Sequence, residues 1–240
     1  MNSNLNRIAG FATALVLLVT CYGQAQNDTQ SSTFITGHPY SARRTVTTKR
    51  PAGTKVLVFL LWRDDQGRTR DEQIQRSPEG GEIRIINVAD PIARQQLSWT
   101  EGPRIEKEVF VTPISNPVQM VDHVPGSDLT PAQRAQAIAQ KRNPNMTGEQ
   151  LGPANINGVE ATGLRTFTVI PAGTEGNEHE LKRVHESWRS PELGDVIVRS
   201  IMEDPRTGTT DIELTEINRS NPAPSLFEPP PGYRVKLVKP

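Results

Sequence analysis

The 240-residue sequence has a single cysteine, Cys21, which lies in an apolar stretch near the start of the chain. A domain that follows this stretch has no disulfide, no cysteine nucleophile and no thiolate ligand for a metal. Aromatic residues are also scarce, at 5%, and hydrophobic residues make up only 35%. The core is therefore predicted to be thin, with one face of the sheet in contact with water.

The sequence has no excess of charge of either sign, with 27 basic and 27 acidic residues. A nucleic-acid-binding protein needs a basic face, and no cluster of Lys and Arg of that kind is present. Nucleic acid is therefore not an expected partner. The charged runs RDDQGRTRDE and EGNEHELKR are predicted to be solvated turns.

The motifs of common enzymes are missing as well. There is no phosphate-binding loop, no dinucleotide fingerprint and no G-x-S-x-G nucleophile elbow. We therefore assign no catalytic residue and no cofactor, and the protein is predicted not to be an enzyme. An active site assembled from carboxylates, or from Ser, His and Asp, that are distant in sequence stays open.

Two histidine-glutamate pairs, at His179 and His185, are the candidates that we considered for a metal site. Their spacing differs from the i, i+4 histidines of a zinc-binding helix, and the segment alternates like a strand. On one strand face the two rings lie about 20 Å apart, too far to hold one ion. They are predicted to be solvent-facing strand residues, and no metal site is assigned.

Residues 1–25 have the layout of a secretory signal peptide. One basic residue, Arg7, precedes an apolar run over residues 8–20, which is short for a membrane span of roughly 20 residues. We therefore predict export to the periplasm or the medium.

Two processing outcomes compete at the end of this segment. Small residues at Gly23 and Ala25 favour cleavage after Ala25, whereas residues 18–21 resemble a lipobox with Cys21 as the lipidated residue. Thr20 is a poor residue before a lipidated cysteine, so cleavage is favoured. Lipidation of Cys21 would make the protein a membrane-anchored lipoprotein, and only then is peripheral membrane contact expected.

Residues 26–37 are polar and predict a flexible tether, and residues 38–240 predict one domain that is mainly β. The run KVLVFLLW is followed by a turn at residues 64–67 and a polar return strand. Asn157-Gly158 is a second hairpin signal. Such turn signals recur about every ten residues, which is typical of a meandering antiparallel sheet.

One segment predicts a helix. Thr130 can cap it, Pro131 suits the first helical position, and Asn143-Pro144 ends it. Its apolar stripe consists of Ala132, Ala135, Ile138 and Ala139. Such a stripe buries little area, so the helix is predicted to lie on a surface or to bridge two halves of the protein.

The predicted fold class is mainly β (α+β), a curved antiparallel sheet or unclosed half-barrel with one or two helices on its face. The helix falls within a proline-rich segment at about 112–153, which we interpret as an insertion into the β domain.

Three tryptophans could line a ligand groove, namely Trp62, Trp99 and Trp188. Each also lies beside a predicted strand end or turn, where tryptophan commonly covers the edge of a core. The core interpretation is the favoured one.

The tail NPAPSLFEPPPGYRV places Leu226 and Phe227 between prolines. It lacks the P-x-x-P spacing of a polyproline ligand. We predict a structural clamp, in which Leu226 and Phe227 plug the end of the sheet. Tyr233 then leads into a last short strand, RVKLV, while the prolines cross the sheet edge without leaving donors unpaired.

Two regions resemble uncharacterised secreted proteins common in Acidobacteria-type bacteria. The first is YSARRTVTTKR followed by WRDDQGRTRDE, and the second runs from Asn157-Gly158-Val159 through IPAGTEGN and ESWRSPELGDVIV to residues 203–233. The second region also resembles, more distantly, the lipoprotein-carrier (LolA-like) and RseB-like proteins. That resemblance implies an unclosed antiparallel half-barrel whose concave face holds acyl chains or other apolar groups.

The expected function is that of a non-enzymatic bacterial envelope protein that binds an apolar ligand, lipid or lipoprotein. The alternative is an interaction or sensor module that recognises another envelope protein, as RseB-like proteins do, and a hydrolase is the least supported class. The single predicted helix and the proline-rich middle depart from the family pattern, which has several helices over the mouth.

Overall fold

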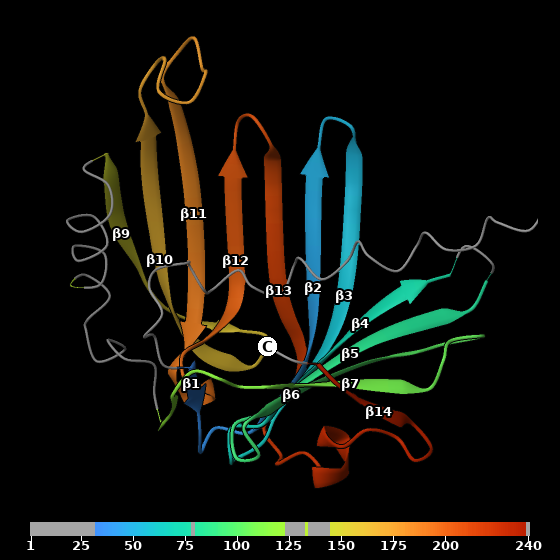
Figure 1. The fold of residues 1–240 in the computed structure, drawn as a ribbon. Helices are drawn as coiled ribbons and strands as arrows, with labels where there is room; N and C mark the ends of the chain where they lie inside the picture. Colours follow the sequence, from blue (N-terminus) through green and yellow to red (C-terminus); the bar gives the residue numbers. More distant parts are fainter. Residues whose placement is uncertain (1–31, 78–79, 123–132, 134–144, 239–240) are drawn as a thin grey trace, which may run out of the picture. The chain divides into compact units, whose positions relative to one another are not determined.

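The computed structural model describes residues 32–77, 80–122, 133 and 145–238, and these residues are mostly in strands (Figure 1). The first half contains β1 (Ser32–Ile35), β2 (Tyr40–Arg50), β3 (Gly53–Arg63), β4 (Thr69–Arg76), β5 (Glu82–Asp90), β6 (Gln95–Glu101), β7 (Glu108–Pro113) and β8 (Val118–Val121). The second half contains β9 (Met146–Ile156), β10 (Val159–Ile170), β11 (Leu181–Ser190), β12 (Val196–Asp204), β13 (Gly208–Asn218) and β14 (Arg234–Leu237). Two short 3₁₀ helices, η1 (Pro191–Leu193) and η2 (Pro224–Phe227), lie between strands of the second half.

Twelve strands form one sheet, in the order β14-β7-β6-β5-β4-β3-β2-β13-β12-β11-β10-β9. The order contains two antiparallel meanders, β2 to β7 and β9 to β13, which join where β2 pairs antiparallel with β13. β14 adds to β7 in parallel. The edges β14 and β9 do not pair with each other, so the predicted unclosed, mainly antiparallel sheet is confirmed.

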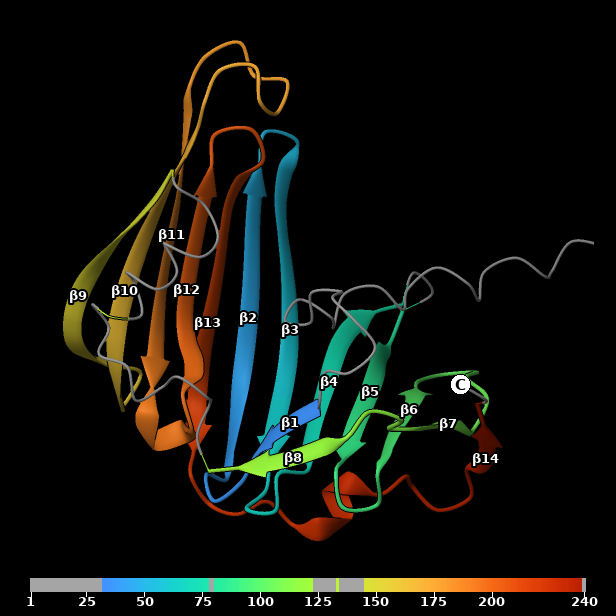
Figure 2. The ribbon, with the colours of Figure 1, turned by 60° about the vertical axis from the view of Figure 1, so that its left-hand side comes forward.

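β1 and β8 pair in parallel as a separate two-stranded sheet (Figure 2). The predicted tether over residues 26–37 is therefore wrong at its end, where residues 32–35 are a strand. The sequence STFI is rich in β-branched and aromatic residues, which suit a strand. Its backbone is held from both ends, because Ser32 N–H donates to Pro117 O at 2.8 Å and Thr36 N–H to Val121 O at 2.7 Å.

The predicted turns have the expected chemistry. Between β3 and β4, the Asp64 carboxylate accepts the backbone N–H groups of Gln66 and Arg68, at 3.1 and 2.8 Å. Gly67 adopts φ of +85°, a region that favours glycine. Asn157-Gly158 likewise closes the hairpin of β9 and β10 with two positive φ angles, 50° and 86°.

The hydrophobic core is divided between the two faces of the sheet. Side chains alternate along β3, so Phe59 and Leu61 point to one side and Trp62 to the other. We call these sides the Phe59 face and the Trp62 face. Leu61 packs on a cluster of Tyr40, Ala42, Val159, Ala161, Leu193, Val198 and Leu214. Trp62 packs on a cluster of Ile86, Val88, Leu97, Trp99, Val109 and Phe227.

The proline-rich tail lies against the second of these clusters. Phe227 is only 3% exposed, and Leu226 and Tyr233 pack against the same cluster. Arg70 donates to the Leu226 carbonyl at 2.7 Å, and the guanidinium of Arg68 lies 4.9 Å from the centre of the Phe227 ring. η2 therefore covers the Trp62 face of strands from the first meander.

The predicted helix at 130–143 lies outside the described residues, apart from residue 133. The described ends of the predicted insertion at 112–153 belong to strands. Residues 146–153 are part of β9, which pairs with β10 as the edge of the main sheet. The prediction that these residues belong to an insertion is therefore wrong. The proline content of this segment favoured an insertion over a strand. An edge strand nevertheless tolerates Pro153 without losing a ladder hydrogen bond.

Replacement of the buried tail aromatic tests its part in stability. We expect Phe227→Ala to lower the free energy of unfolding by about 3–5 kcal/mol, as for a fully buried aromatic. The control is Phe110→Ala, because Phe110 is 42% exposed, and it should cost about 1 kcal/mol or less. Urea denaturation measures both, and equal losses in the two variants would show that the tail is not a clamp.

Candidate functional site

A continuous row of paired residues crosses the Phe59 face at the centre of the sheet. In register from β13 to β5, the row is Leu214, Arg44, Phe59, Gln73 and Ile85. Directly opposed residues of antiparallel strands share one face, so these side chains are neighbours. The row is apolar at both ends and has a cation near its middle.

Apolar side chains continue beyond this row toward the β2–β3 hairpin. Ile212, Val46 and Leu57 lie opposite one another on β13, β2 and β3. All three are half-buried. The Phe59 face therefore has an accessible apolar area on the hairpin side of Arg44.

Arg44 is held within this apolar area. Its guanidinium carbon lies 4.4 Å from the centre of the Phe59 ring, a cation–π contact. Burial lowers the pKa of Arg44, while the nearby charge of Asp71 and the Tyr40 hydroxyl act in the opposite direction. Its Nε is buried and has no hydrogen-bond partner in the described part of the chain.

Asp71 lies on the same face, one row away, opposite Leu61 and Asn87. Its carboxylate accepts a hydrogen bond from the Asn87 amide at 3.2 Å. Burial raises the pKa of Asp71, and the Asn87 hydrogen bond and the positive charge of Arg44 only partly oppose this rise. The acid is therefore held in surroundings that favour its neutral form.

The Trp62 face of the second meander is different, because it is covered with ion pairs. Arg165 of β10 binds Glu186 at 2.8 Å and Glu149 at 3.4 Å. Arg199 of β12 binds Asp211 at 3.4 Å. These paired charges make that surface a poor site for an apolar ligand.

The three tryptophans do not line one groove. Trp62 and Trp99 come together on the Trp62 face, with the guanidinium of Arg70 at 5.7 and 5.0 Å from their rings. Trp99 is 2% exposed and belongs to the core, the interpretation that the sequence favours. Trp188 lies on β11, where its indole N–H donates to Glu186 at 2.8 Å.

The run RDDQGRTRDE is not a solvated turn throughout, so that prediction is wrong. Asp64, Arg70 and Glu72 are 1%, 9% and 4% exposed. Arg70 and Glu72 form a buried ion pair beneath η2, because alternation along β4 directs both to the Trp62 face. Their i, i+2 spacing within the return strand is the one signal that could have revealed this pair.

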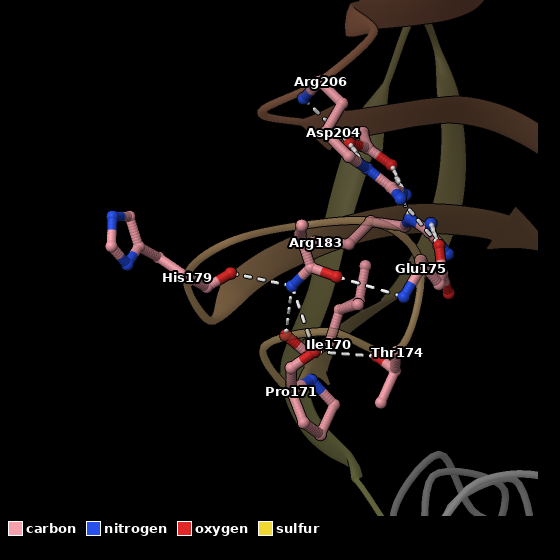
Figure 3. A network of polar contacts seen from close by, with 9 residues as sticks. Ile170, Pro171, Thr174, Glu175, His179, Arg183, Asp204 and Arg206 are labelled. Carbon is pink, nitrogen blue, oxygen red and sulfur yellow. Dashed lines mark hydrogen bonds and ion pairs between the residues drawn. The ribbon is translucent and has the colours of Figure 1, made fainter.

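The loop between β10 and β11 is tied to the β12–β13 turn by charged groups (Figure 3). Asp204 accepts from Arg183 and from Arg206, both at 2.9 Å. Arg206 also binds Glu175 of the loop at 2.7 Å. The hydrogen bonds from Arg206, followed by that from Arg183, hold the pKa of Asp204 far below its usual range.

His179 belongs to this loop and not to a strand, which corrects the prediction for the histidine pair. The amide of Asn177 donates to the carbonyl oxygens of Ile170, Pro171 and His179, at 3.3, 3.0 and 2.7 Å. These hydrogen bonds hold the loop that precedes β11, which begins at Leu181.

His185 is on β11, where its Nε2 lies 2.9 Å from the Ser200 hydroxyl. Burial is the main cause that lowers the pKa of His185, and the charge of Arg189 adds to it. The described residues contain no group of three or more side chains that could hold a metal ion. None of their helices is long and apolar enough to cross a membrane.

Of the other predicted site residues, Cys21 lies outside the described part of the chain. Leu226, Phe227 and Tyr233 meet on the cluster beneath η2. Sequence reasoning missed Arg44 and Asp71 as site residues, although both lie in the segments that carry the first family resemblance.

Comparison with known proteins finds similarity only among solved structures. No family model matches the chain, and no curated protein matches it. The matched chain of the Pseudomonas aeruginosa MucA/MucB complex has a TM-score of 0.36 at 11% identity, over 84% of this chain and 59% of that one. The protein thus spans less than two thirds of that chain's length.

Two further structures cover more of their own length. The Mycobacterium tuberculosis lipoprotein LppX matches with a TM-score of 0.31 and 10% identity, over 76% of this chain and 88% of LppX. A LolA superfamily protein from Nitrosomonas europaea matches with a TM-score of 0.28 and 8% identity, over 80% and 90% of the two chains. These likenesses are to a MucB complex, a mycobacterial lipoprotein and a LolA superfamily protein, and they extend to neither a ligand nor a partner of this protein.

The Asp204 network generates a prediction on acid stability. A carboxylate with a depressed pKa stabilises the fold above its unfolded pKa, near 4, and this stabilisation is lost as the pH falls toward the folded value. We expect Asp204→Asn to lower the free energy of unfolding at pH 7 by about 1.5–3 kcal/mol. The loss should shrink at pH 3.

Urea denaturation at pH 7 and pH 3 measures this difference. Glu203→Gln is the control, because Glu203 is the exposed neighbour of Asp204 on β12. A loss for Asp204→Asn that is the same at both pH values would mean that its charge does not stabilise the fold.

Proposed function

We propose that the protein is a non-enzymatic binding protein of the bacterial envelope, which holds the apolar part of a lipid or lipoprotein against the Phe59 face. The observation that carries the proposal is the half-buried apolar area of Ile212, Val46 and Leu57, built on neighbouring strands of one sheet. An acyl chain gains about 0.8 kcal/mol for each methylene group it buries. Burial of about eight such groups contributes about 6 kcal/mol.

Export is part of the same proposal and rests on the signal-like residues 1–25. After cleavage behind Ala25, the protein would work in the periplasm or outside the cell. If Cys21 is lipidated instead, it would work at a membrane surface. Native mass spectrometry of protein purified from its own envelope distinguishes these outcomes by mass, and it should also detect a co-purifying lipid.

The site itself is tested with a matched pair of substitutions. Leu57 and Val58 are adjacent, half-buried residues of β3 that point to opposite faces. We expect Leu57→Asn to weaken binding of a fluorescent long-chain lipid probe about tenfold, or about 1.4 kcal/mol. Val58→Asn should leave the affinity within about twofold, and equal effects of the two changes would exclude the Phe59 face as the site.

A second candidate function is recognition of another envelope protein by the β14 edge. Val235 and Leu237 are 62% and 80% exposed. Arg234 N–H donates to the Lys107 carbonyl at 2.8 Å and Val238 N–H to the Val111 carbonyl of β7 at 2.9 Å, so the N–H groups of the alternate residues point away from the sheet. An extended segment of a partner could add there as a further strand.

Cross-linking and pull-down from envelope extract test this second function. A stoichiometric partner that is captured by the native protein and lost with Leu237→Lys would support it. Repeated absence of such a partner would count against it.

A further inference from the structure

We infer that Arg44 is an anion-binding group of the Phe59 face and that the ligand is an amphiphile with one negative charge, a long-chain fatty acid. This inference rests on the proposed function, because it names the chemical class of the ligand of the same face. The argument begins with the hydrogen bonds that Arg44 lacks.

Arg63 and Arg70 are buried arginines of this sheet, and the protein satisfies both of them. Arg63 donates to the His38 carbonyl at 3.0 and 2.8 Å and also to the Leu193 carbonyl. Arg70 binds Glu72 and the Leu226 carbonyl. Arg44 is half-buried, makes no hydrogen bond or ion pair within the described residues, and has a buried Nε without a partner.

A half-buried cation whose buried Nε lacks a partner is costly, so the position of Arg44 requires explanation. The cation–π contact with Phe59 covers one face of the guanidinium, and it supplies no hydrogen-bond acceptor. The edge of the planar group, with its N–H donors, stays available. A carboxylate matches this edge with two parallel hydrogen bonds.

The protein groups that face Arg44 do not provide that carboxylate. Asp71 is the nearest acid, but it forms no ion pair with Arg44 within 4 Å and instead accepts from Asn87. Burial raises the pKa of Asp71, which favours its neutral form. Burial also raises the pKa of the Tyr40 hydroxyl, which is therefore neutral near pH 7.

The side chains around Arg44 indicate that the anionic group of the ligand is attached to an apolar chain. Leu214 and Phe59 flank Arg44 in its own row, and Ile212, Val46 and Leu57 form the next row toward the β2–β3 hairpin. The apolar row lies about 7 Å from Arg44 along β2, and Thr48, opposite Lys55 and Thr210, follows it toward the hairpin. One unpaired cation calls for one negative charge, since a second would itself be left unpaired in an apolar site.

The test compares an acid with its neutral analogue on delipidated protein. Equilibrium dialysis measures binding of labelled palmitic acid, 1-hexadecanol and a phosphatidylglycerol to the full chain. The native protein should bind palmitic acid at least about tenfold more tightly than hexadecanol, or about 1.4 kcal/mol. Arg44→Met should remove this preference and leave hexadecanol binding unchanged.

The control variant is Arg43→Met, which removes the same charge from the opposite face of the same strand. It should keep the preference for the acid. Arg44→Lys retains the charge without the planar edge and should keep part of that preference, which distinguishes loss of anion binding from loss of folding. Circular dichroism and a thermal melt confirm that each variant is folded.

Each outcome decides between the two proposals. Equal binding of acid and alcohol by the native protein, or an unchanged preference in Arg44→Met, would overturn the role of Arg44 while the proposed function stands. Failure to bind any of the three lipids would overturn the proposed function as well. Tighter binding of phosphatidylglycerol than of palmitic acid would show that the anion is a phosphodiester and overturn the fatty-acid assignment.

Discussion

The pairing of β2 with β13 is the interaction on which the rest of the sheet depends. It joins two meanders whose other ladders are local, and it brings residues 40–50 beside residues 208–218. Gly208 permits this approach, because a Cβ there would lie 2.0 Å from the Lys49 carbonyl oxygen. Without this pairing neither Arg44 nor the apolar row of Ile212, Val46 and Leu57 would have neighbours on both sides.

Features determined by short-range chemistry could be predicted from the sequence. The turn at Asp64–Gly67 and the hairpin at Asn157-Gly158 follow from backbone preferences of a few residues. Pairings between distant strands, such as β14 with β7, have no local signature, and neither has the loop before β11 that the Asn177 amide holds. The candidate site was missed for the same reason, since the apolar surroundings of Arg44 come from Phe59 and Leu214 on other strands.

The low hydrophobic content explains why charged side chains take part in the interior. With 35% hydrophobic residues, the sheet has a core cluster on each face. Arginine side chains and the aromatic rings that they contact fill space that aliphatic residues fill in more hydrophobic cores. Arg70 lies between Trp62 and Trp99, and Arg44 stacks on Phe59. A buried arginine is therefore a structural element here and is not by itself a sign of a site.

Arg70 and Arg44 differ in whether their N–H groups have hydrogen-bond acceptors. Arg70 is closed in by Glu72 and by the Leu226 carbonyl, so its charge is neutralised and η2 covers it. Arg44 has the same kind of ring contact without an acceptor, on a face whose next row is half-buried and apolar. Stability alone would favour an aliphatic residue at such a position, because stacking offsets only part of the desolvation of a cation. The presence of a charge at Arg44 is therefore better explained by an anionic ligand that carries an apolar chain.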